Sequence, residues 1–301
     1  MNKAEILDKI LHLRHIDTLL SNFIDIDIGS DSRVYTSYSF VETGRLASAE
    51  DELGRGSHLQ NIPPQVRRMY IADEGKLLIE ADKKQGEAMI VAWLADETRM
   101  KEVFKSGGDV HKRNASYIFN KPESAITSEE RYLAKRMVHA TNYGMSTNTM
   151  ATYCDISELD ARKAQSAYFA AFPRILTWQR EVREQVSKTS ILTNCFGRRR
   201  IFFERVGEEL FREAYAYNPQ STLVDDVNRS MVEIFFRGEP ELELLHQGHD
   251  SLLWQVDTQK ASWAVGLIKK YMELPFFCES EMIIIPVEIK AGRSWGELKN
   301  V

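Results

Sequence analysis

The chain has 301 residues, of which 43% are hydrophobic and 28% charged, and its net charge is −5. This composition excludes wholesale disorder and is sufficient for a sizeable core in one or two subdomains. The negative charge disfavours a protein that coats nucleic acid through bulk electrostatics, because nonspecific phosphate binding normally requires a positive surface.

The distribution of apolar, cysteine and basic residues along the chain limits the possible class of protein further. No stretch of about 18 apolar residues occurs, and the start, Met1 to Leu7, mixes charges into an amphipathic helix instead of a signal peptide, so we expect a soluble, cytoplasmic protein with no membrane partner. Cys154, Cys195 and Cys278 are widely spaced and lack a C-x-x-C pair, which predicts reduced packing residues. Basic residues cluster at 67–68, 112–113, 135–136 and 198–200, so a charged cleft in an acidic shell is compatible with the composition.

Helical and strand patterns alternate in the first hundred residues. Apolar residues recur at helical spacing near the start, and β-branched and aromatic residues mark the strands that follow. Gly107-Gly108 ends the last helical stretch. The predicted elements are a helix over 4–22, a strand over 34–40, a loop over 43–61, a strand over 77–81 and a helical stretch over 87–104.

The region from His111 to about Thr189 is almost wholly helical. Ser128 is the expected N-cap of one helix, and Ser157 with Asp160 resembles a capping box. The elements predicted after it are strands over 191–193 and 201–203, a helix over 220–236, a hairpin centred on 249–250, a helix over 259–273 and a strand over 282–289. The pattern predicts an α+β fold, an antiparallel β platform interrupted by a helical subdomain.

Two aspartates, Asp82 and Asp250, stand at the ends of apolar runs, where strands would hold their carboxylates rigidly at a rim. Two hard cations that bridge a triphosphate require such ligands, and Mg²⁺ is the expected ion. Either aspartate alone is more typical of a turn, whereas the pair favours a metal site. Glu80 lies on the same strand face as Asp82, and we interpret it as solvated or structural.

A predicted helix between these aspartates carries Arg131, Lys135, His139 and Tyr143 at successive four-residue steps. Side chains at this spacing share one helix face, which would supply positive charge for phosphates. Lone basic residues on a helix usually form a solvated face. Together with the aspartates they predict a nucleotidyltransferase.

In these motifs the chain resembles the DNA polymerases of family A, the bacterial polymerase I class, most closely the bacteriophage versions, from residue 4 to residue 301. The motifs stand in the expected order: Thr43-Gly44-Arg45-Leu46 with His58 to Pro63, Asp82 to Glu87, Gly108 to His111, Arg131 to Gly144, Pro219 to Thr222, and His249-Asp250-Ser251.

The resemblance implies an antiparallel palm sheet with a helical fingers subdomain. The palm would comprise 1–97, with a thumb-base helix at 4–22, and 212–301, with the catalytic hairpin, and the fingers would comprise 98–211. Most of the thumb and the exonuclease domain would be missing. The expected setting is a bacterial or phage-infected cell, and a separate chain is expected to supply the thumb or exonuclease.

The resemblance also implies the catalytic residues Asp82, Asp250 and Lys135. The two carboxylates and the backbone carbonyl of Lys83 would bind two Mg²⁺ ions, for which Mn²⁺ is expected to substitute. One ion would lower the pKa of the primer 3′-hydroxyl while the other neutralises the triphosphate. Lys135 would also protonate the departing pyrophosphate.

The implied partners are primer-template DNA and deoxynucleoside triphosphates. Glu87 would be the steric gate that leaves no room for a ribose 2′-hydroxyl, and Tyr143 would stack near the template base. The implied nucleotide-binding residues are Arg131, Lys135, His111, His139, Tyr143, Glu87 and Gln85. The implied DNA contacts are Arg45, Gln60, Asn61, Arg212, Gln220 and His249, with the basic turn at 196–200 as a further candidate.

Four positions depart from the family pattern. Lys83-Lys84 replaces Tyr-Ser, Ser251 replaces Glu, and His139 occupies a position that is usually Phe or Tyr. Two other functions compete with a polymerase core: a noncatalytic or split-enzyme fragment that binds nucleic acid or a replication partner, and a single-subunit RNA polymerase. Glu87 argues against the RNA polymerase, because an RNA-making site must accommodate the 2′-hydroxyl.

Overall fold

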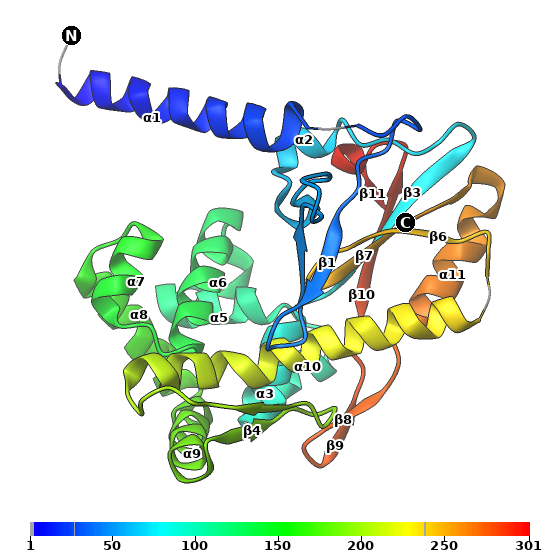
Figure 1. Ribbon diagram of the computed structural model, residues 1–301. Coiled ribbons are helices and arrows are strands. Elements are labelled where there is room, and N and C mark those ends of the chain that lie inside the picture. Colours follow the sequence, from blue (N-terminus) through cyan, green and yellow to red (C-terminus); the bar gives the residue numbers. More distant parts are fainter. Residues whose placement is uncertain (1–2, 27, 238) are drawn as a thin grey trace. The chain divides into compact units, whose positions relative to one another are not determined.

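The computed structural model describes residues 3–26, 28–237 and 239–301, so Met1 and Asn2 of the predicted start lie outside the described residues. Contacts divide the chain into two compact units (Figure 1). The sheet unit comprises Met1–Asp82, Ser230–Met272 and Val287–Val301, and the helical unit comprises Lys83–Arg229 and Glu273–Pro286. These limits differ from the predicted boundaries after residues 97 and 211. They differ because helix α3 (Gly86–Leu94) and most of helix α10 (Glu208–Phe236) contribute to the core of the helical unit.

A five-stranded sheet with the strand order β11-β10-β3-β7-β6 forms the centre of the sheet unit. Strand β7 runs antiparallel to β3, and so does β6 to β7 and β11 to β10, which confirms the antiparallel platform expected from the sequence. Leu78, Ile79 and Ala81 of the central strand are buried. The bounds are β3 Lys76–Lys83, β6 Glu243–Gln247, β7 Ser251–Asp257, β10 Val287–Gly292, β11 Lys299–Asn300, α2 Pro64–Arg67 and α11 Ala261–Met272.

A separate two-stranded sheet joins the strand predicted over 34–40 to part of the segment predicted to be a loop. Strand β1 (Ser37–Phe40) pairs antiparallel with β2 (Leu46–Ala49) across a turn in which Gly44 has φ +80°. The loop predicted over 43–61 is therefore wrong in part. The Ala-Ser-Ala sequence of β2 has no strong strand preference of its own, and pairing with β1 supplies its backbone hydrogen bonds.

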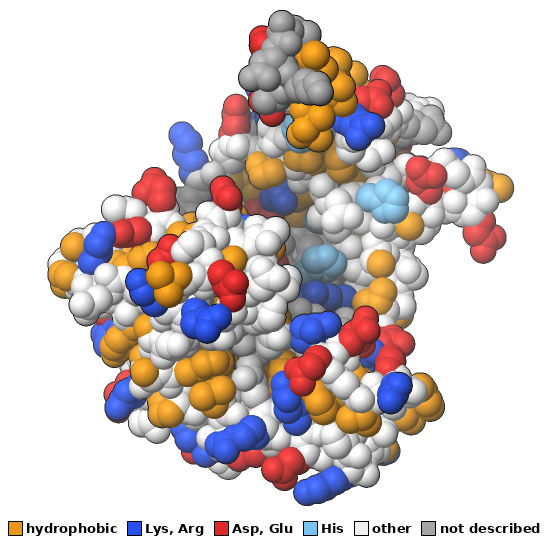
Figure 2. Space-filling model, turned by 90° about the vertical axis from the view of Figure 1, so that its left-hand side faces the viewer, with side chains coloured by type: hydrophobic (Ala, Val, Ile, Leu, Met, Phe, Trp, Pro, Cys, Tyr) orange, Lys and Arg blue, Asp and Glu red, His pale blue; other side chains and the backbone are white. Residues whose placement is uncertain are grey.

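The N-terminal helix leaves much of its apolar surface exposed. Helix α1 (Lys3–Leu19), extended by a π-helical turn over Leu20–Ile24, confirms the helix expected over 4–22. Leu7 is 61% exposed and Leu13 is 65% exposed. Hydrophobic side chains are visible at the surface at the top of the view in Figure 2. Among the described residues, only the end of the helix reaches the core of the sheet unit, through Leu19 and Phe23. Every helix in the described ranges is too short or too polar to cross a lipid bilayer.

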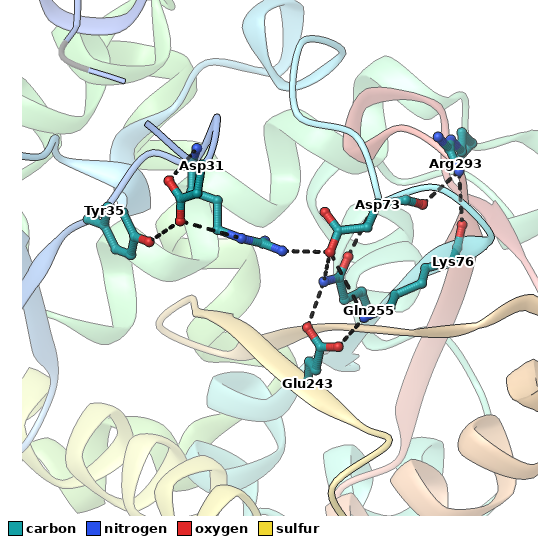
Figure 3. Close-up of polar contacts among 8 residues, drawn as sticks. Asp31, Tyr35, Asp73, Lys76, Glu243, Gln255 and Arg293 are labelled. Carbon is teal, nitrogen blue, oxygen red and sulfur yellow. Dashed lines mark hydrogen bonds and ion pairs between the residues drawn. The ribbon is translucent and has the colours of Figure 1, made fainter. Parts of the chain in front are cut away.

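A polar network joins the segment before β1 to the central strands (Figure 3). The buried amide of Gln255 on β7 donates to Asp73 at 2.8 Å and to Glu243 at 2.7 Å. Arg33 donates to the same Asp73 carboxylate at 2.5 Å, and Lys76 forms an ion pair with Glu243. Because each partly exposed carboxylate accepts from more than one donor, the network holds this part of the chain on the sheet.

The helical unit is built from consecutive helices. One apolar core includes Trp93, Tyr168 and Phe172, and a second cluster includes Met137 and Met150. This arrangement confirms the helical region expected from His111 to Thr189. The bounds are α3 Gly86–Leu94, α4 Thr98–Lys105, α5 Val110–Phe119, α6 Ser128–Asn142, α7 Thr147–Cys154, α8 Glu158–Ala171, α9 Pro173–Thr189, β4 Ile191–Thr193, β5 Arg199–Ile201, β8 Phe276–Cys278 and β9 Glu281–Ile283, and α10 spans Glu208–Phe236.

Helix starts follow hydrogen-bonding groups more closely than apolar spacing. Ser157 caps α8 as expected, with its hydroxyl accepting from the Asp160 N–H at 3.1 Å. The N-cap of α6, however, is Thr127 and not Ser128, because Thr127 and Glu130 form a reciprocal capping box. The stretch predicted over 87–104 is two helices, since Asp96 has φ +50° and interrupts it.

Two further boundaries were predicted wrongly near prolines. Helix α10 begins at Glu208 and not at Gln220, and Pro219 lies inside it. Burial of Tyr215 and Tyr217 offsets the hydrogen bond that a helical proline cannot make. The strand predicted over 282–289 is interrupted before Pro286, which lacks the N–H needed to continue a ladder, and becomes β9 and β10.

Candidate active site

The two predicted metal ligands meet at one end of the sheet. Strand β3 pairs with β7 so that Asp82 lies opposite Ser251, the residue that follows Asp250. Gly248 N–H donates to the Ser251 carbonyl at 2.8 Å and closes the tight hairpin turn that carries Asp250. The hairpin predicted at 249–250 is therefore confirmed, and its register brings the two aspartates together.

Electrostatics at this end of the sheet favour a bound cation. Burial raises the pKa of Asp82 to about 7, and the negative charge of Asp250 is the second cause. Glu80 raises the pKa further, whereas Lys290 on the neighbouring strand β10 lowers it. Glu80 itself accepts a hydrogen bond from the Trp295 indole at 2.9 Å, in keeping with the structural role expected for it.

The two aspartates suit a hard divalent ion whose remaining ligands are waters or phosphate oxygens. No group of three or more His, Cys, Asp or Glu side chains is arranged to hold a metal ion in the ranges that the structure describes. Mg²⁺ is often bound through one or two carboxylates plus waters and phosphate oxygens, so a pair of aspartates is a sufficient protein contribution. The acidic surroundings of Asp82 are where such a cation would relieve repulsion.

The residue after Asp82 enters the helical unit as a buried cation. The Lys83 ammonium donates to Asp226 of α10 at 2.5 Å, and both side chains are fully buried. Arg229 lies 3.7 Å from the same carboxylate. Burial lowers the pKa of Lys83 and raises that of Asp226, while their mutual attraction opposes both shifts. Next along the chain, Lys84 N–H donates to the Pro286 carbonyl at 2.8 Å.

Three of the predicted nucleotide-binding residues converge at the end of α6. Tyr143 donates its hydroxyl to Glu87 Oε2 at 2.9 Å, and His139 Nε2 lies 3.1 Å from the same oxygen. The His139 and Tyr143 rings meet edge to face at 4.6 Å. Gly144 follows with φ +71°, and a Cβ there would lie 2.8 Å from the Tyr215 ring, so only glycine fits.

The basic residues of α6 surround a buried histidine of α5. Arg131 donates to Asp109 at 2.6 Å, and Asp109 also caps α5 by accepting from the His111 and Lys112 N–H groups. Burial lowers the pKa of His111 to about 4, with the charges of Lys135 and Arg131 as the next causes. His111 Nδ1 is buried and, among the described residues, has no hydrogen-bond partner.

Other predicted site residues have partners within their own units. Gln85 accepts from the Val110 N–H at 2.9 Å and so helps to position α5. Gln60 donates to the Gln247 side chain and backbone, both at 3.0 Å, and accepts from the Ser48 N–H. Arg45, Asn61 and His249 belong to the sheet unit, while Arg212 and Gln220 lie on α10 in the helical unit.

A group of polar residues next to the hairpin turn of the sheet unit was not predicted from the sequence. Tyr38 on β1 bonds to His246 Nδ1 at 2.8 Å and accepts from the Gln247 N–H at 3.2 Å. His246 and Gln247 are the residues just before the hairpin turn, and both are buried. Their position beside Asp250 in the sequence was the available signal. Tyr38 has no such signal, because its partners are far away in the chain.

Most arginines of the basic turn at 196–200 form ion pairs within the protein. Arg198 donates to both oxygens of the Asp225 carboxylate at 2.6 to 3.1 Å, and Arg200 donates to Glu213 at 2.5 Å. Two of the three arginines suggested as DNA contacts therefore bind carboxylates on α10. Arg199 is exposed.

An α+β fold with paired aspartates at the end of an antiparallel sheet is typical of nucleotidyltransferases. The family model for DNA polymerase family A matches residues 1–297, and the chain belongs to this family.

Relatives and solved structures agree with that assignment. The thermostable DNA polymerase I of Thermus filiformis is 29% identical over 313 residues, which cover 98% of this chain and 36% of that protein. The DNA polymerase I of Deinococcus radiodurans is 28% identical over 319 residues, covering 98% and 32%. The POL domain of Pol1 from M. smegmatis, solved in complex with DNA primer-template and dNTP, matches with a TM-score of 0.80 and 28% identity, over 94% of this chain and 50% of that one. The chain spans about a third of the length of these curated relatives.

The buried Lys83–Asp226 pair predicts a distinctive stability pattern. Lys83→Met or Asp226→Leu alone should lower the free energy of unfolding by about 3 to 5 kcal/mol, because each removes the hydrogen-bonded partner of a fully buried charge. The double variant should regain most of that loss. Urea unfolding measures the free energy of unfolding of each variant. The control variant Lys188→Met breaks an exposed pair with Glu184 and should lower this free energy by less than about 1 kcal/mol. A double variant as unstable as the sum of the singles contradicts the prediction.

Two histidines should resist protonation in the native state. Burial lowers the pKa of His111 and of His246 to about 4, so both rings should stay neutral at pH 5.5. Each then contributes stability that is present above pH 6.5 and is lost as pH falls toward 4, on the order of 2 kcal/mol by pH 5. Histidine nitrogen shifts in NMR spectra, assigned with His111→Gln and His246→Gln, test this. Titration of either ring near pH 6.5 would refute it.

Proposed function

We propose that this chain is the core of a template-directed DNA polymerase, which adds deoxynucleotides to a primer 3′-hydroxyl with the help of two Mg²⁺ ions. The single observation that supports this most is the β3–β7 register, which brings Asp82 beside Asp250 in a member of DNA polymerase family A. Under this proposal the sheet unit acts as the palm, and most of the helical unit acts as the fingers.

In the proposed site Asp82, Asp250 and the Lys83 carbonyl bind the metal ions. When bound, the ions activate the primer hydroxyl and neutralise charge on the triphosphate. The protein's own part is to hold two mutually repelling carboxylates at one rim. The register of β3 and β7, closed by the Gly248 turn, performs that task.

Basic residues of the helical unit would bind the triphosphate. Arg131 and Lys135 supply positive charge, and Lys135, which is exposed on α6, is our candidate for protonating pyrophosphate. His111 stays neutral at pH 7 because of its lowered pKa. We therefore assign it a hydrogen bond to a phosphate oxygen in place of an ionic contact, and its unpartnered Nδ1 supports this role.

The cluster at the end of α6 is our candidate for sugar discrimination. Glu87 is held by Tyr143 and His139 through one carboxylate oxygen, so its side chain has a defined position. A carboxylate fixed in this way would exclude a ribose 2′-hydroxyl by steric clash and by burial of an unpaired polar group. The His139 ring here would pack against the incoming sugar in place of the usual Phe or Tyr.

Primer-template DNA is the proposed macromolecular substrate. Asn61 and His249 are exposed and Arg45 is partly exposed in the sheet unit, and Arg212 is exposed on α10, so these side chains are available for minor-groove contacts that do not depend on sequence. For Gln60 and Gln220 we propose the same role, with Gln60 held in place by Gln247.

A split-enzyme arrangement is the second candidate. The exposed apolar side chains of α1 favour a covering segment or separate chain that supplies the thumb or exonuclease function. The cytoplasm of a bacterial or phage-infected cell is the proposed setting, and the phage-type assignment within the family remains a prediction.

Primer extension with Mg²⁺ or Mn²⁺ and four deoxynucleotides tests the proposed function. Asp82→Asn and Asp250→Asn should each lower the rate roughly a thousand-fold or more, because a metal ligand is worth several kcal/mol at the transition state. Both should also lose Mn²⁺ binding measured by paramagnetic resonance. Asp257→Asn, at the other end of β7, should leave both properties unchanged. A wild-type chain that is inactive at high concentration and with a thumb-containing partner would favour the noncatalytic fragment.

Glu87→Ala should relax sugar selectivity. Removal of the carboxylate opens the space next to the 2′ carbon, so the preference for deoxynucleotides over ribonucleotides should fall roughly ten- to a hundred-fold. The ratio of kcat/KM values for the two substrates measures this change. Glu102→Ala, an exposed acid on α4, is the matched control. Equal use of ribonucleotides by the unmodified chain would overturn the choice of a DNA polymerase.

A further inference from the structure

Two of the three cysteines lie in contact, although 83 residues separate them. The sulfur atoms of Cys195 and Cys278 are 3.4 Å apart in the helical unit. Cys195 lies in the turn between β4 and β5, and Cys278 is the last residue of β8. All three cysteines are free, in keeping with the reduced packing residues expected from the sequence. The contact within this pair was not predicted, because the sequence contains no sign that these two segments meet.

Independent contacts hold each of the two segments in place. The turn is anchored to α10, because Asn194 donates to Asp225 at 2.7 Å and Arg198 binds the same carboxylate through both of its oxygens. On the other side, Glu281 of the β8–β9 hairpin accepts from Lys101 at 2.6 Å.

A ring contact between the same segments adds to this, with the Phe196 and Phe276 centroids 5.0 Å apart. The sulfur contact thus lies between two restrained backbones.

The two thiols differ in exposure and in acidity. Cys195 is partly exposed, whereas Cys278 is completely buried. The interaction between the two sulfur atoms lowers the pKa of Cys195 and raises the pKa of Cys278, with burial adding to the rise. The more exposed residue, Cys195, is therefore also the one that more readily forms a thiolate, which is the reactive species. Cys278 is placed to act second.

We propose that Cys195 and Cys278 form a redox-active dithiol that reacts with small-molecule disulfides such as glutathione disulfide and closes to an intramolecular disulfide. The Cys195 thiolate attacks one sulfur of the small disulfide, forming a mixed disulfide and releasing one small thiol. The Cys278 thiol then loses its proton, attacks Cys195 and releases the second small thiol. The protein loses two electrons and two protons, and the small disulfide gains them.

The geometry makes the second step short. A disulfide bond is about 2.05 Å long, so each sulfur needs to move by roughly 0.7 Å from the reduced positions. Formation of the mixed disulfide also removes the Cys195 thiolate, whose hydrogen bond and charge are among the causes that keep Cys278 protonated. The product would tie the β4–β5 turn to the β8–β9 hairpin and close a long chain loop, which restricts the unfolded chain.

Equilibration of the full-length protein with mixtures of reduced and oxidised glutathione tests the proposal. Free thiols should fall from three to one, the intact mass should decrease by two hydrogens, and a cross-linked peptide should contain Cys195 and Cys278. Tm should rise by roughly 5 °C on oxidation and return after reduction. These readouts do not involve nucleotide transfer, so their outcome is independent of the proposed polymerase function.

Variants separate the two steps. Cys278→Ser should trap one glutathionyl group on Cys195, because the resolving thiol is absent, while Cys195→Ser should take up none. Cys154→Ser is the matched control, since Cys154 is buried away from the pair, and it should oxidise as the wild type does. Retention of three free thiols by the wild type in fully oxidised glutathione, or a disulfide that includes Cys154, would overturn the proposal. The wild-type measurement holds even if a variant fails to fold.

Discussion

Repulsion between two carboxylates is the constraint on which the candidate active site depends. Asp82 and Asp250 would separate if their segments were free, because like charges in partly buried surroundings raise each other's energy. The antiparallel register of β3 and β7 prevents this. Burial and, after it, the negative charge of Asp250 raise the pKa of Asp82 to about 7. The hydrogen bonds between the two strands thus hold the two carboxylates together against their repulsion. A bound cation would reduce that repulsion.

Two consecutive residues, the partly buried acid Asp82 and the fully buried cation Lys83, belong to different units. Asp82 belongs to the sheet unit, and the Lys83 side chain lies wholly within the helical unit, paired with Asp226. A buried ion pair contributes less to stability than well-packed apolar groups of the same size, but it tolerates very few alternative arrangements. The departure at Lys83 from the usual family residue is thus matched by a partner on α10. The peptide that we propose for metal binding is therefore followed directly by a buried anchor, the Lys83–Asp226 pair.

Elements with a strong local signal were predicted well. The apolar run before Asp82, the hairpin at Asp250 and the helical region after His111 depend on periodicity and turn chemistry that neighbouring residues carry. Strand β2 was missed because its pairing with β1 decides its structure, and the start of α10 was missed because tertiary burial outweighs Pro219. In the site, the four-residue spacing of His139 and Tyr143 foretold their contact. Their joint contact with Glu87, 52 and 56 residues away, was not predictable from spacing.

By itself the sequence determined the type of each chemical group and its place on a strand end or helix face, because hydrophobic period and local hydrogen bonding act over a few residues. It also determined the family, through motifs in a fixed order. Only the tertiary structure decided which other distant groups pair with one another: Lys83 with Asp226, Gln60 with Gln247 and Cys195 with Cys278. The members of each pair are far apart in the chain and meet only when the chain folds and closes a long loop. Local sequence patterns extend over a few residues and therefore do not predict such contacts.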